Sequence, residues 1–215
     1  MKLHKVIEMI LSIPKTIYVN FHLLPFKQAV CFPILVNWKT TIEGLNGKML
    51  MDTVKPGIVR IGFGGSFALG GGTYIKLDGK IRIKGKCTMG RGTQLVVSKN
   101  GELVLGKNFN MNANCILNAS RSITFGDDCL LGWNTTVLDS DGHKIIREKA
   151  ASNICGIQIE DHVWICSDVK ILKGAAVAKD SVVAANATIT KSFEKRNLLI
   201  GGNNRIISEN ISWER

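Results

Sequence analysis

Aliphatic residues recur every six positions in the C-terminal third of the chain. The pattern runs without a miss through Ile159, Ile165, Ile171, Val177, Val183 and Ile189. Two shorter runs have the same spacing, Phe125–Leu131–Val137 and Leu105–Met111–Leu117, and an offset of two residues separates them. We interpret this offset as a small bulge or a lengthened corner. A helix has a period of about 3.6 residues and a half-buried strand a period of about two, so neither explains a strict period of six.

A period of six is typical of a chain that winds as a coil with three short sides. One aliphatic residue per side points inward, about eighteen residues complete a turn, and neighbouring coils pair as parallel strands. The corners need residues that tolerate a positive φ, as Gly, Asn and Asp do. Such residues occur in phase at 106–108, 126–128 and 132–134, and at Asp161, Asp168 and Asp180. The sequence therefore predicts an all-β fold, a three-sided parallel β-helix.

Composition adds a cellular context and a class of partner. The 215 residues suffice for one domain with an appendage, and 28 Lys and Arg against 17 acids give a net charge of +11. This surplus favours an anionic ligand or surface. The six cysteines form no CxxC pair and have no metal-binding spacing, which indicates reduced thiols and no metal site. Without a membrane-spanning segment or a signal peptide, we expect a cytoplasmic protein.

The first 57 residues do not follow the six-residue pattern. Leu3, Val6, Ile7, Ile10 and Leu11 have helical spacing, and Pro14 is expected to end that helix. The segment that follows is apolar with a few lysines. It either caps the open end of the first coil or makes a peripheral contact with a membrane, and both roles are compatible. We predict an N-terminal cap over residues 1–57, the β-helix over 58–207 and a tail over 208–215.

The run IQIEDHVWICSDVKILKGAAVAKDSVVAANATITKSF, residues 157–193, resembles the hexapeptide-repeat acyltransferases. The resemblance extends over roughly residues 58–207 and is closest to the maltose, galactoside and polysaccharide O-acetyltransferases. It implies a left-handed β-helix, acetyl-coenzyme A as the donor, and a homotrimer with active sites between subunits. The chain departs from the family where glycine is most common, at Glu160, Cys166, Ala178 and Ala184.

An insertion interrupts the repeat between Val137 and Ile159, which lie 22 residues apart. The protruding loop, predicted over residues 139–156, contains one histidine, His143. By resemblance, His143 is the general base, a role that suits an imidazole because it exchanges protons near neutral pH. Asp141 or Asp139 would then hold one ring nitrogen and fix the tautomer. The alternative is a solvated loop histidine beside an Asp-Gly turn.

The resemblance also implies a path for the donor. Trp164, in Val163-Trp164-Ile165-Cys166, would form a wall at the thioester, unless it is only a packing residue between subunits. The positions that would line the coenzyme are Ser167, Ala185 and Thr190, and the cations for its phosphates are Lys191 and Arg205. Lys191 is otherwise a solvated charge at the end of a coil. The segment around Arg205 is one residue shorter than the family's motif and lacks its proline.

On the acceptor side, the resemblance assigns contact with the sugar and the donor to Asn112. A ladder-forming asparagine is the competing explanation. The implied reaction is acetyl transfer to a hydroxyl of a sugar or glycan of the capsule or lipopolysaccharide type. The acceptor is either free or linked to a lipid. Direct attack on the thioester is expected, because no cysteine stands in a recognisable nucleophile turn. A metal-dependent enzyme on this fold would need three histidine ligands. Only two histidines, His143 and His162, lie in the repeat region, and His162 is expected at a corner, so this class of enzyme is not expected.

The segment 80–86 alternates basic and apolar residues. As a strand it would bury Ile81 and Ile83 and place Lys80, Arg82 and Lys84 on one outer face. This face is either simply solvated or meets a lipid-linked sugar or anionic lipid at the inner face of the membrane. Nucleic acid is not expected, because no aromatic residues are interleaved with the cations. The second hypothesis for function is therefore a non-catalytic β-helix that binds membrane or a partner through its basic face.

Overall fold

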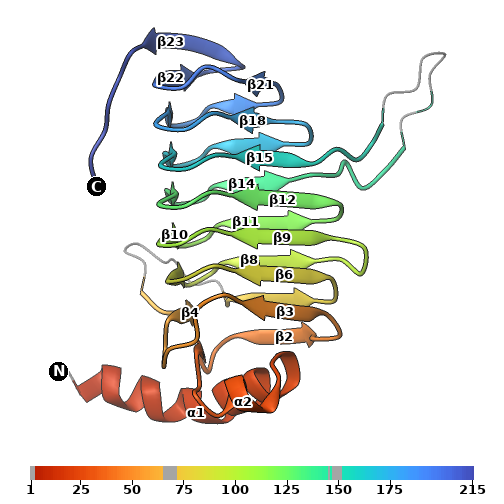
Figure 1. The fold of residues 1–215 in the computed structure, drawn as a ribbon, viewed down its shortest axis with the longest axis vertical. Coiled ribbons are helices and arrows are strands. Elements are labelled where there is room, and N and C mark those ends of the chain that lie inside the picture. The colour runs from red at the N-terminus through yellow and green to blue at the C-terminus, as the bar shows by residue number, and fades with distance from the viewer. Residues whose placement is uncertain (1–2, 65–71, 145, 147–151) are drawn as a thin grey trace.

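The chain winds into a left-handed, three-sided β-helix, which confirms the predicted fold class (Figure 1). The computed structural model describes residues 3–64, 72–144, 146 and 152–215. Successive strands visit three sheets, A, B and C, in turn, so each coil has an A–B, a B–C and a C–A edge. Strands that neighbour each other in a sheet are parallel, with the final pair, β22 and β23, as the exception among the described strands.

The strands of the three sheets are as follows. Sheet A consists of β1 (Ile34–Val36), β4 (Val59–Ile61), β7 (Cys87–Met89), β10 (Phe109–Met111), β13 (Leu130–Leu131), β16 (Trp164–Ile165), β19 (Val182–Val183), β22 (Leu198–Gly201) and β23 (Arg205–Glu209). Sheet B consists of β2 (Thr41–Gly44), β5 (Tyr74–Leu77), β8 (Gln94–Val97), β11 (Ile116–Ala119), β14 (Thr136–Leu138), β17 (Lys170–Leu172) and β20 (Thr188–Ile189). Sheet C consists of β3 (Lys48–Met51), β6 (Lys80–Ile83), β9 (Glu102–Leu105), β12 (Ser122–Phe125), β15 (Ile157–Ile159), β18 (Ala176–Val177) and β21 (Ser192–Phe193).

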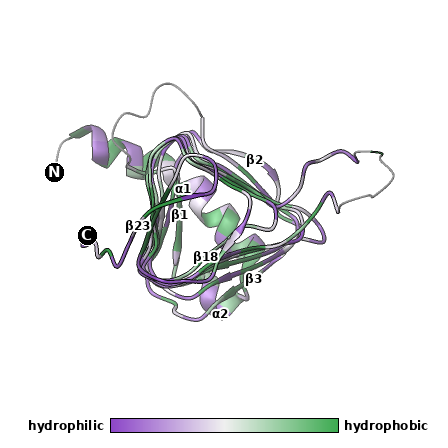
Figure 2. Cartoon of the chain, turned by 90° about the horizontal axis from the view of Figure 1, so that it is seen from above, coloured by the Kyte–Doolittle hydropathy of each residue, from purple (hydrophilic) through white to green (hydrophobic). Residues whose placement is uncertain are grey.

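The six-residue pattern forms the core. All six positions from Ile159 to Ile189 are buried, with 0% or 1% of their surface exposed. The two extra residues between Leu117 and Phe125 lie at the B–C edge. Since β11 pairs with β14, and β12 with β15, without a shift in register, they lengthen the corner rather than forming a bulge. Viewed along the axis, the coils superpose as a triangle (Figure 2).

The corners use the left-handed backbone that the sequence predicted. A column of positive-φ residues runs along the C–A edge, Asn108, Asp128, His162, Asp180 and Asn197, with φ between 54° and 61°. His162 therefore has the corner role expected for it and takes the positive φ that the sequence suggested for Asp161. Its Nδ1 lies 3.1 Å from Oδ1 of Asp180 in the next coil.

The N-terminal segment differs from the prediction in two respects. Helix α1 (Leu3–Leu23) continues through Pro14, and the short helix α2 (Phe26–Ala29) follows it. Pro14 is exposed on the outer side of α1, where water can satisfy the carbonyl group that it leaves without a donor. The first coil begins at Ile34, because β1 pairs with β4, so the boundary predicted at residue 57 falls inside the β-helix.

The two helices lie across the end of the β-helix at which the chain starts (Figure 1). The pattern missed the first coil because its core positions are unevenly spaced and β2 pairs with β5 through an irregular register. Val36 and Ile42 are six residues apart, but Ile42 and Met51 are nine apart. Within the described ranges, no helix is long and apolar enough to cross a membrane.

The C-terminal end is closed by an antiparallel strand. β23 pairs with β22 and extends to Glu209, so the predicted boundary between residues 207 and 208 lies within this strand. The following residues run back along the C–A edge (Figure 1). There Ile211 N donates to the carbonyl oxygen of Asn197 at 3.0 Å, and Trp213 Nε1 to that of His162 at 2.9 Å.

The loop leaves the B–C edge between β14 and β15, and its described part points away from the β-helix (Figure 2). A short antiparallel ladder forms its base, with a bridge between Ser140 and Ile154. Asp141 N donates to the carbonyl oxygen of Asn153 at 2.9 Å, and Cys155 N to that of Asp139 at 3.0 Å.

Candidate active site

His143 lies on the protruding loop beyond this ladder. Its side chain is exposed, and among the described residues it has no hydrogen-bond or ion-pair partner. Backbone hydrogen bonds join the two strands of the loop base below it. The histidine is therefore presented to the outside of the chain rather than folded against its own β-helix.

Asp139 has a structural role instead of the predicted contact with the imidazole. Its side chain is fully buried, and its carboxylate accepts three backbone N–H groups: from Ser120 at 2.7 Å, from Arg121 at 2.8 Å and from Ser122 at 2.7 Å. These donors belong to the lengthened B–C corner of the preceding coil. Asp139 thus fixes the start of the loop to that corner, because both of its oxygens are occupied by backbone donors.

Asp141 is fixed to the loop base by a lysine. Its Oδ2 accepts from Lys173 Nζ at 2.6 Å, and the same nitrogen donates to the carbonyl oxygen of Ser152 at 2.7 Å. Lys173 therefore joins the outgoing and the returning strands of the loop. Of the two predicted carboxylates, Asp141 is the one on the exposed side of the loop, two residues from His143.

Asn112, Ser167 and Ala185 gather on the A–B edge. Each follows an inward-facing residue of sheet A by one or two positions, so the coil repeat stacks them along one ridge. Asn112 N donates to the carbonyl oxygen of Leu131 at 3.0 Å, and Ser167 accepts from Asn186 N at 3.1 Å. Trp164 projects from the outer face of sheet A, with 37% of its surface exposed, and its ring lies 5.9 Å from that of Trp213 in the C-terminal tail.

Asn112 also lines a pocket of about 760 Å³ on the outer face of sheet A, whose wall combines polar groups with apolar side chains such as Val6, Met9 and Phe63. The pocket lies between the N-terminal half of α1 and the strands β4, β7 and β10, and its lining includes Arg60, Arg91, Thr88 and Asn110. Asn110 Nδ2 donates to Thr88 Oγ1 at 2.8 Å, which orients the amide. Hydroxyl, amide and guanidinium groups together suit a hydroxylated or anionic ligand.

Sequence reasoning missed Arg60, Arg91 and Asn110. Arg60 and Asn110 each stand between two inward-facing residues, Val59 and Ile61 or Phe109 and Met111. The alternation would have placed them on the outer face, but it carries no information on which coils α1 borders. Arg91 is at the next corner and forms an ion pair with Glu8 of α1, at 2.6 Å.

The remaining residues that were predicted to bind the donor do not lie on the A–B ridge. Thr190 and Lys191 are exposed at the B–C edge, between β20 and β21. Thr190 exchanges hydrogen bonds of 2.8 Å with the side chain of Asn204, through its N–H and its hydroxyl. Arg205 is exposed at the start of β23, opposite Gly201.

The predicted site residues therefore occupy both edges that border sheet B. The A–B edge carries Asn112, Ser167 and Ala185, and the B–C edge carries His143 with Thr190 and Lys191. A single chain does not bring the two groups together, because the full width of sheet B separates them.

Four of the six cysteine thiols are unsuited to covalent catalysis because they are buried or partly buried. Burial raises the pKa of Cys87, Cys115 and Cys129 to about 12. Partial burial also raises the pKa of Cys166, beside Trp164 and Ser167. A raised pKa keeps the thiol protonated, and the nucleophile is the thiolate. Over the part of the chain that the structure describes, no group of three or more His, Cys, Asp or Glu side chains could hold a metal ion.

The predicted basic face exists but is partly neutralised. In β6, Ile81 and Ile83 are buried while Lys80 and Arg82 are exposed, as the alternation predicted. Lys80 forms an ion pair with Glu102 at 2.6 Å, and Arg82 with Asp52 at 3.0 Å. The guanidinium group of Arg82 also lowers the pKa of Asp52. This face therefore has less free positive charge than its sequence suggests.

Comparison with known proteins yields a consistent group of relatives. No family model matches the chain. It is 26% identical over 145 residues to the polysialic acid O-acetyltransferase of Escherichia coli O1:K1, which covers 66% of this chain and 45% of the relative. It is 31% identical over 108 residues to the galactoside O-acetyltransferase of E. coli K12, which covers 49% of this chain and 53% of the relative. The chain spans about half the length of the curated relatives it matches.

Among solved structures, the polySia-specific acetyltransferase NeuO superposes with a TM-score of 0.60. The superposition covers 85% of this chain and 84% of that one, at 18% sequence identity. It shows that the two chains share a fold that extends over most of their length.

Proposed function

Because its sequence and fold resemble those of the hexapeptide-repeat acyltransferases, we propose that this chain belongs to that family and transfers the acetyl group of acetyl-coenzyme A to a hydroxyl of a sugar or glycan. One observation carries the proposal. The loop with His143 and the ridge with Asn112, beside Trp164, lie on the two edges that border the same sheet. An active site assembles when the B–C edge of one protomer meets the A–B edge of another.

A homotrimer with sheet B turned toward the threefold axis produces this meeting between every adjacent pair. The outer face of sheet B supports the proposal, because its central strands present mainly uncharged side chains: Val96, Ile116, Thr136, Leu138 and Leu172. In the matching coils, the outer face of sheet C instead presents polar side chains, such as Ser122, Thr124 and Gln158. Its charged groups lie in the N-terminal coils, where sheet B also carries charge. Uncharged faces are the ones that subunit interfaces bury.

In this arrangement the donor lies between protomers. Its pantetheine arm would run along the ridge of Ser167 and Ala185, with Trp164 bordering the thioester. Lys191 and Thr190, on the B–C edge of the neighbouring protomer, and Arg205 are the candidates for the phosphate end. The acceptor would enter the pocket between α1 and sheet A, where Asn112 is at the boundary between the pocket and the ridge.

The proposed chemistry is a direct transfer. The imidazole of His143 takes the proton of the acceptor hydroxyl while the oxygen attacks the thioester carbonyl. A backbone N–H of the A–B edge stabilises the oxyanion of the tetrahedral intermediate. The intermediate collapses by breaking the C–S bond, and the imidazolium returns the proton to the departing thiolate. We assign to Asp141 the positioning of the loop that carries His143, through its contact with Lys173.

The acceptor class follows from the pocket and the charge of the chain. Arg60 at the pocket and the net charge of +11 suit an anionic glycan of the capsule or lipopolysaccharide type, while Arg91 at the same pocket is ion-paired with Glu8. The competing hypothesis, a non-catalytic β-helix that binds through its basic face, loses support from the ion pairs of Lys80 and Arg82.

Calorimetric titration with acetyl-coenzyme A, followed by an assay of coenzyme A release with oligosaccharide acceptors, tests the proposal. We expect saturable binding at one site per chain. The His143→Ala variant should bind the donor equally well and lose transfer by about 10²–10⁴-fold. His22→Ala, which changes an exposed histidine of α1, is the matched control and should retain both. No binding at millimolar donor, or full turnover by His143→Ala, would contradict the proposal.

A further inference from the structure

Helix α1 has its polar face inside and its apolar face outside. Its buried residues include Ser12, Thr16 and Asn20, spaced four apart on one side. Its exposed side carries large apolar residues along the whole length: Leu3, Ile7, Met9, Ile10, Leu11, Ile13, Ile17, Tyr18 and Phe21. A surface helix of a water-soluble domain has the opposite arrangement.

The polar face is explained by the strand edge that it covers. β1 is the first strand of sheet A, so one row of its backbone groups has no strand beside it. Asn20 donates to the carbonyl oxygen of Ile34 at 2.6 Å and accepts from its N–H at 3.1 Å. Thr16 Oγ1 accepts from Val36 N at 3.1 Å, and Ser12 Oγ from Trp38 N at 3.0 Å. The helix thus satisfies an open sheet edge with side chains, and its apolar residues are left facing outward.

The apolar surface continues beyond α1. Phe26 of α2 is 71% exposed, and Val30 and Phe32 follow on the same end of the molecule. An apolar groove of about 240 Å³ lies between α1 and the first coils, lined by Met9, Ile13, Ile17, Phe32, Leu35 and Phe63 with Ser12 and Thr16 at its floor. Contiguous apolar surfaces of this extent mark sites that bind another apolar phase or molecule.

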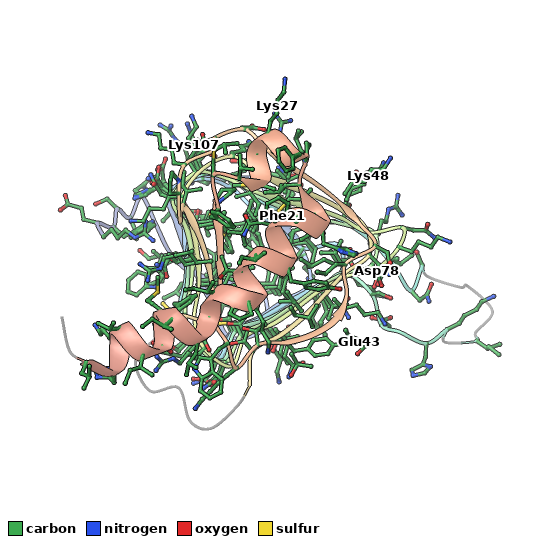
Figure 3. The ribbon with its side chains drawn as sticks, turned by 90° about the horizontal axis from the view of Figure 1, so that it is seen from below. Phe21, Lys27, Glu43, Lys48, Asp78 and Lys107 are labelled. Atoms are coloured by element: carbon green, nitrogen blue, oxygen red, sulfur yellow. The ribbon has the colours of Figure 1, made fainter. Side chains whose placement is uncertain are left out.

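The charges around this surface decide between possible occupants. Residues 1–40 contain five lysines and one acid, Glu8. Glu8 is engaged by Arg91 at 2.6 Å and by Asn37 Nδ2 at 2.7 Å, on the side away from the apolar face. The exposed lysines Lys5 and Lys27 lie toward opposite ends of the α1–α2 segment. Figure 3 looks directly at this end, with Phe21 on α1 and the side chain of Lys27 reaching outward at the rim.

An apolar helix face whose own segment carries exposed cations, and whose one acid is ion-paired, is complementary to the surface of an anionic lipid bilayer. We propose that the outer face of α1 and α2 docks on such a bilayer, with α1 in the plane of the interface. Because α1 lies across the end of the β-helix (Figure 1), the β-helix then stands upright on the membrane. The same helix serves as the cap of the first coil and as the membrane contact. This surface exists in the single chain and does not depend on the proposed enzymatic activity.

Co-sedimentation of the full chain with vesicles tests this proposal without donor or acceptor. Vesicles of phosphatidylcholine and phosphatidylglycerol (7:3) should bind the chain, and vesicles of phosphatidylcholine alone should bind it at least tenfold more weakly. The double variant Ile10→Asp/Ile17→Asp should lower the partition onto anionic vesicles at least tenfold. Both side chains face outward, so circular dichroism and thermal melting should show an intact fold.

Leu50→Asp is the matched control, because Leu50 is 55% exposed on the side wall, close to the 58% of Ile10. It should bind like the unmodified chain. The proposal is overturned if the chain stays in the supernatant with anionic vesicles or if the double variant sediments like the unmodified chain. It is also overturned if light scattering shows that the face joins two copies of the chain and the vesicles do not compete. Acetyl transfer to a water-soluble acceptor is measured separately, so either proposal can fail alone.

Discussion

The indole of Trp213 lies flat on the imidazole of His162, with ring centroids 4.1 Å apart and an angle of 6° between the planes. Trp213 Nε1 donates to the carbonyl oxygen of the same histidine at 2.9 Å. The indole also lies 5.9 Å from the ring of Trp164. The C-terminal tail, which the sequence predicted as a separate segment, therefore adds a second aromatic ring to the surface where we propose that Trp164 borders the donor.

Trp213→Ala should weaken donor binding more than it slows the chemical step. Removal of the indole leaves Trp164 without its aromatic neighbour, and aromatic pairs contribute about 0.5–1.5 kcal/mol beyond burial. We expect the KM for acetyl-coenzyme A to rise about three- to tenfold, while kcat changes less than about twofold. Trp213→Phe keeps the stacked ring and should stay close to the unmodified enzyme. Equal KM values for all three proteins would show that Trp213 only holds the tail in place.

The β-helix could be predicted because its interactions repeat. Each inward position from Ile159 to Ile189 meets the same environment one coil later, so the period survives as a pattern in one dimension. His162 shows the same regularity, since the column of positive-φ corners fixes its backbone. The first coil could not be predicted, because its core positions are unevenly spaced and the free edge of β1 is satisfied by side chains of α1.

Helix α1 shows that an apolar pattern can predict a helix correctly and still predict the wrong buried face. The apolar spacing of Ile7, Ile10 and Leu11 predicts a helix, and the helix exists. The same spacing suggests that the apolar side is buried, whereas the structure buries Thr16 and Asn20. The four-residue spacing of Glu8, Ser12, Thr16 and Asn20 was visible in the sequence, but its meaning depends on an open strand edge that only the fold reveals.

Asn20→Leu should strongly destabilise the protein. Leucine has a similar volume but leaves the buried N–H and carbonyl group of Ile34 without their partners. An unsatisfied buried polar group costs about 1–3 kcal/mol, so we expect the free energy of unfolding to fall by about 2–5 kcal/mol. Urea unfolding measures this difference. Asn46→Leu, at an exposed asparagine that contacts Asp78, is the control and should cost less than about 1 kcal/mol.

The two loop carboxylates should separate into a stability residue and an activity residue. Asp139→Asn places an amide NH2 against backbone N–H groups that now meet a carboxylate oxygen, and we expect a loss of about 2–4 kcal/mol in unfolding free energy. Asp141→Asn removes an exposed ion pair with Lys173 and should cost less than about 1 kcal/mol. If Asp141 positions the loop for catalysis, its variant loses turnover at unchanged thermal stability.

The choice between Asp139 and Asp141 was beyond sequence reasoning for a physical reason. Both acids precede His143 at short spacing, and either could reach an imidazole in an extended loop. The lengthened corner at Ser120–Ser122 decides, because it turns three N–H groups toward one buried carboxylate. If the Asp139→Asn variant is stable but has lost turnover, Asp139 would instead have the role that the sequence suggested, as the partner of the His143 imidazole.

Thiol reactivity offers an independent test of the direct-attack mechanism. Cys31 and Cys155 are exposed, so two of the six thiols should react rapidly with an aromatic disulfide reagent in the native protein. Cys87, Cys115 and Cys129 have a pKa of about 12, which leaves only about one thiol in a thousand ionised at pH 9. Raising the pH from 7 to 9 should therefore leave these three thiols unreactive in the native protein. All six thiols should react after unfolding.

Cys166 is the decisive thiol, because it lies directly beside the proposed donor ridge. Its raised pKa favours the protonated form, so it should react slowly, and Cys166→Ser should retain two rapidly reacting thiols and acetyl transfer within about threefold of the unmodified enzyme. A third rapidly reacting thiol that disappears in Cys166→Ser, together with lost turnover, would instead indicate an acetyl-cysteine intermediate. Direct attack requires that His143→Ala abolish transfer while Cys166→Ser does not. The pair of variants therefore assigns the acetyl acceptor in the first step to the sugar hydroxyl or to the protein.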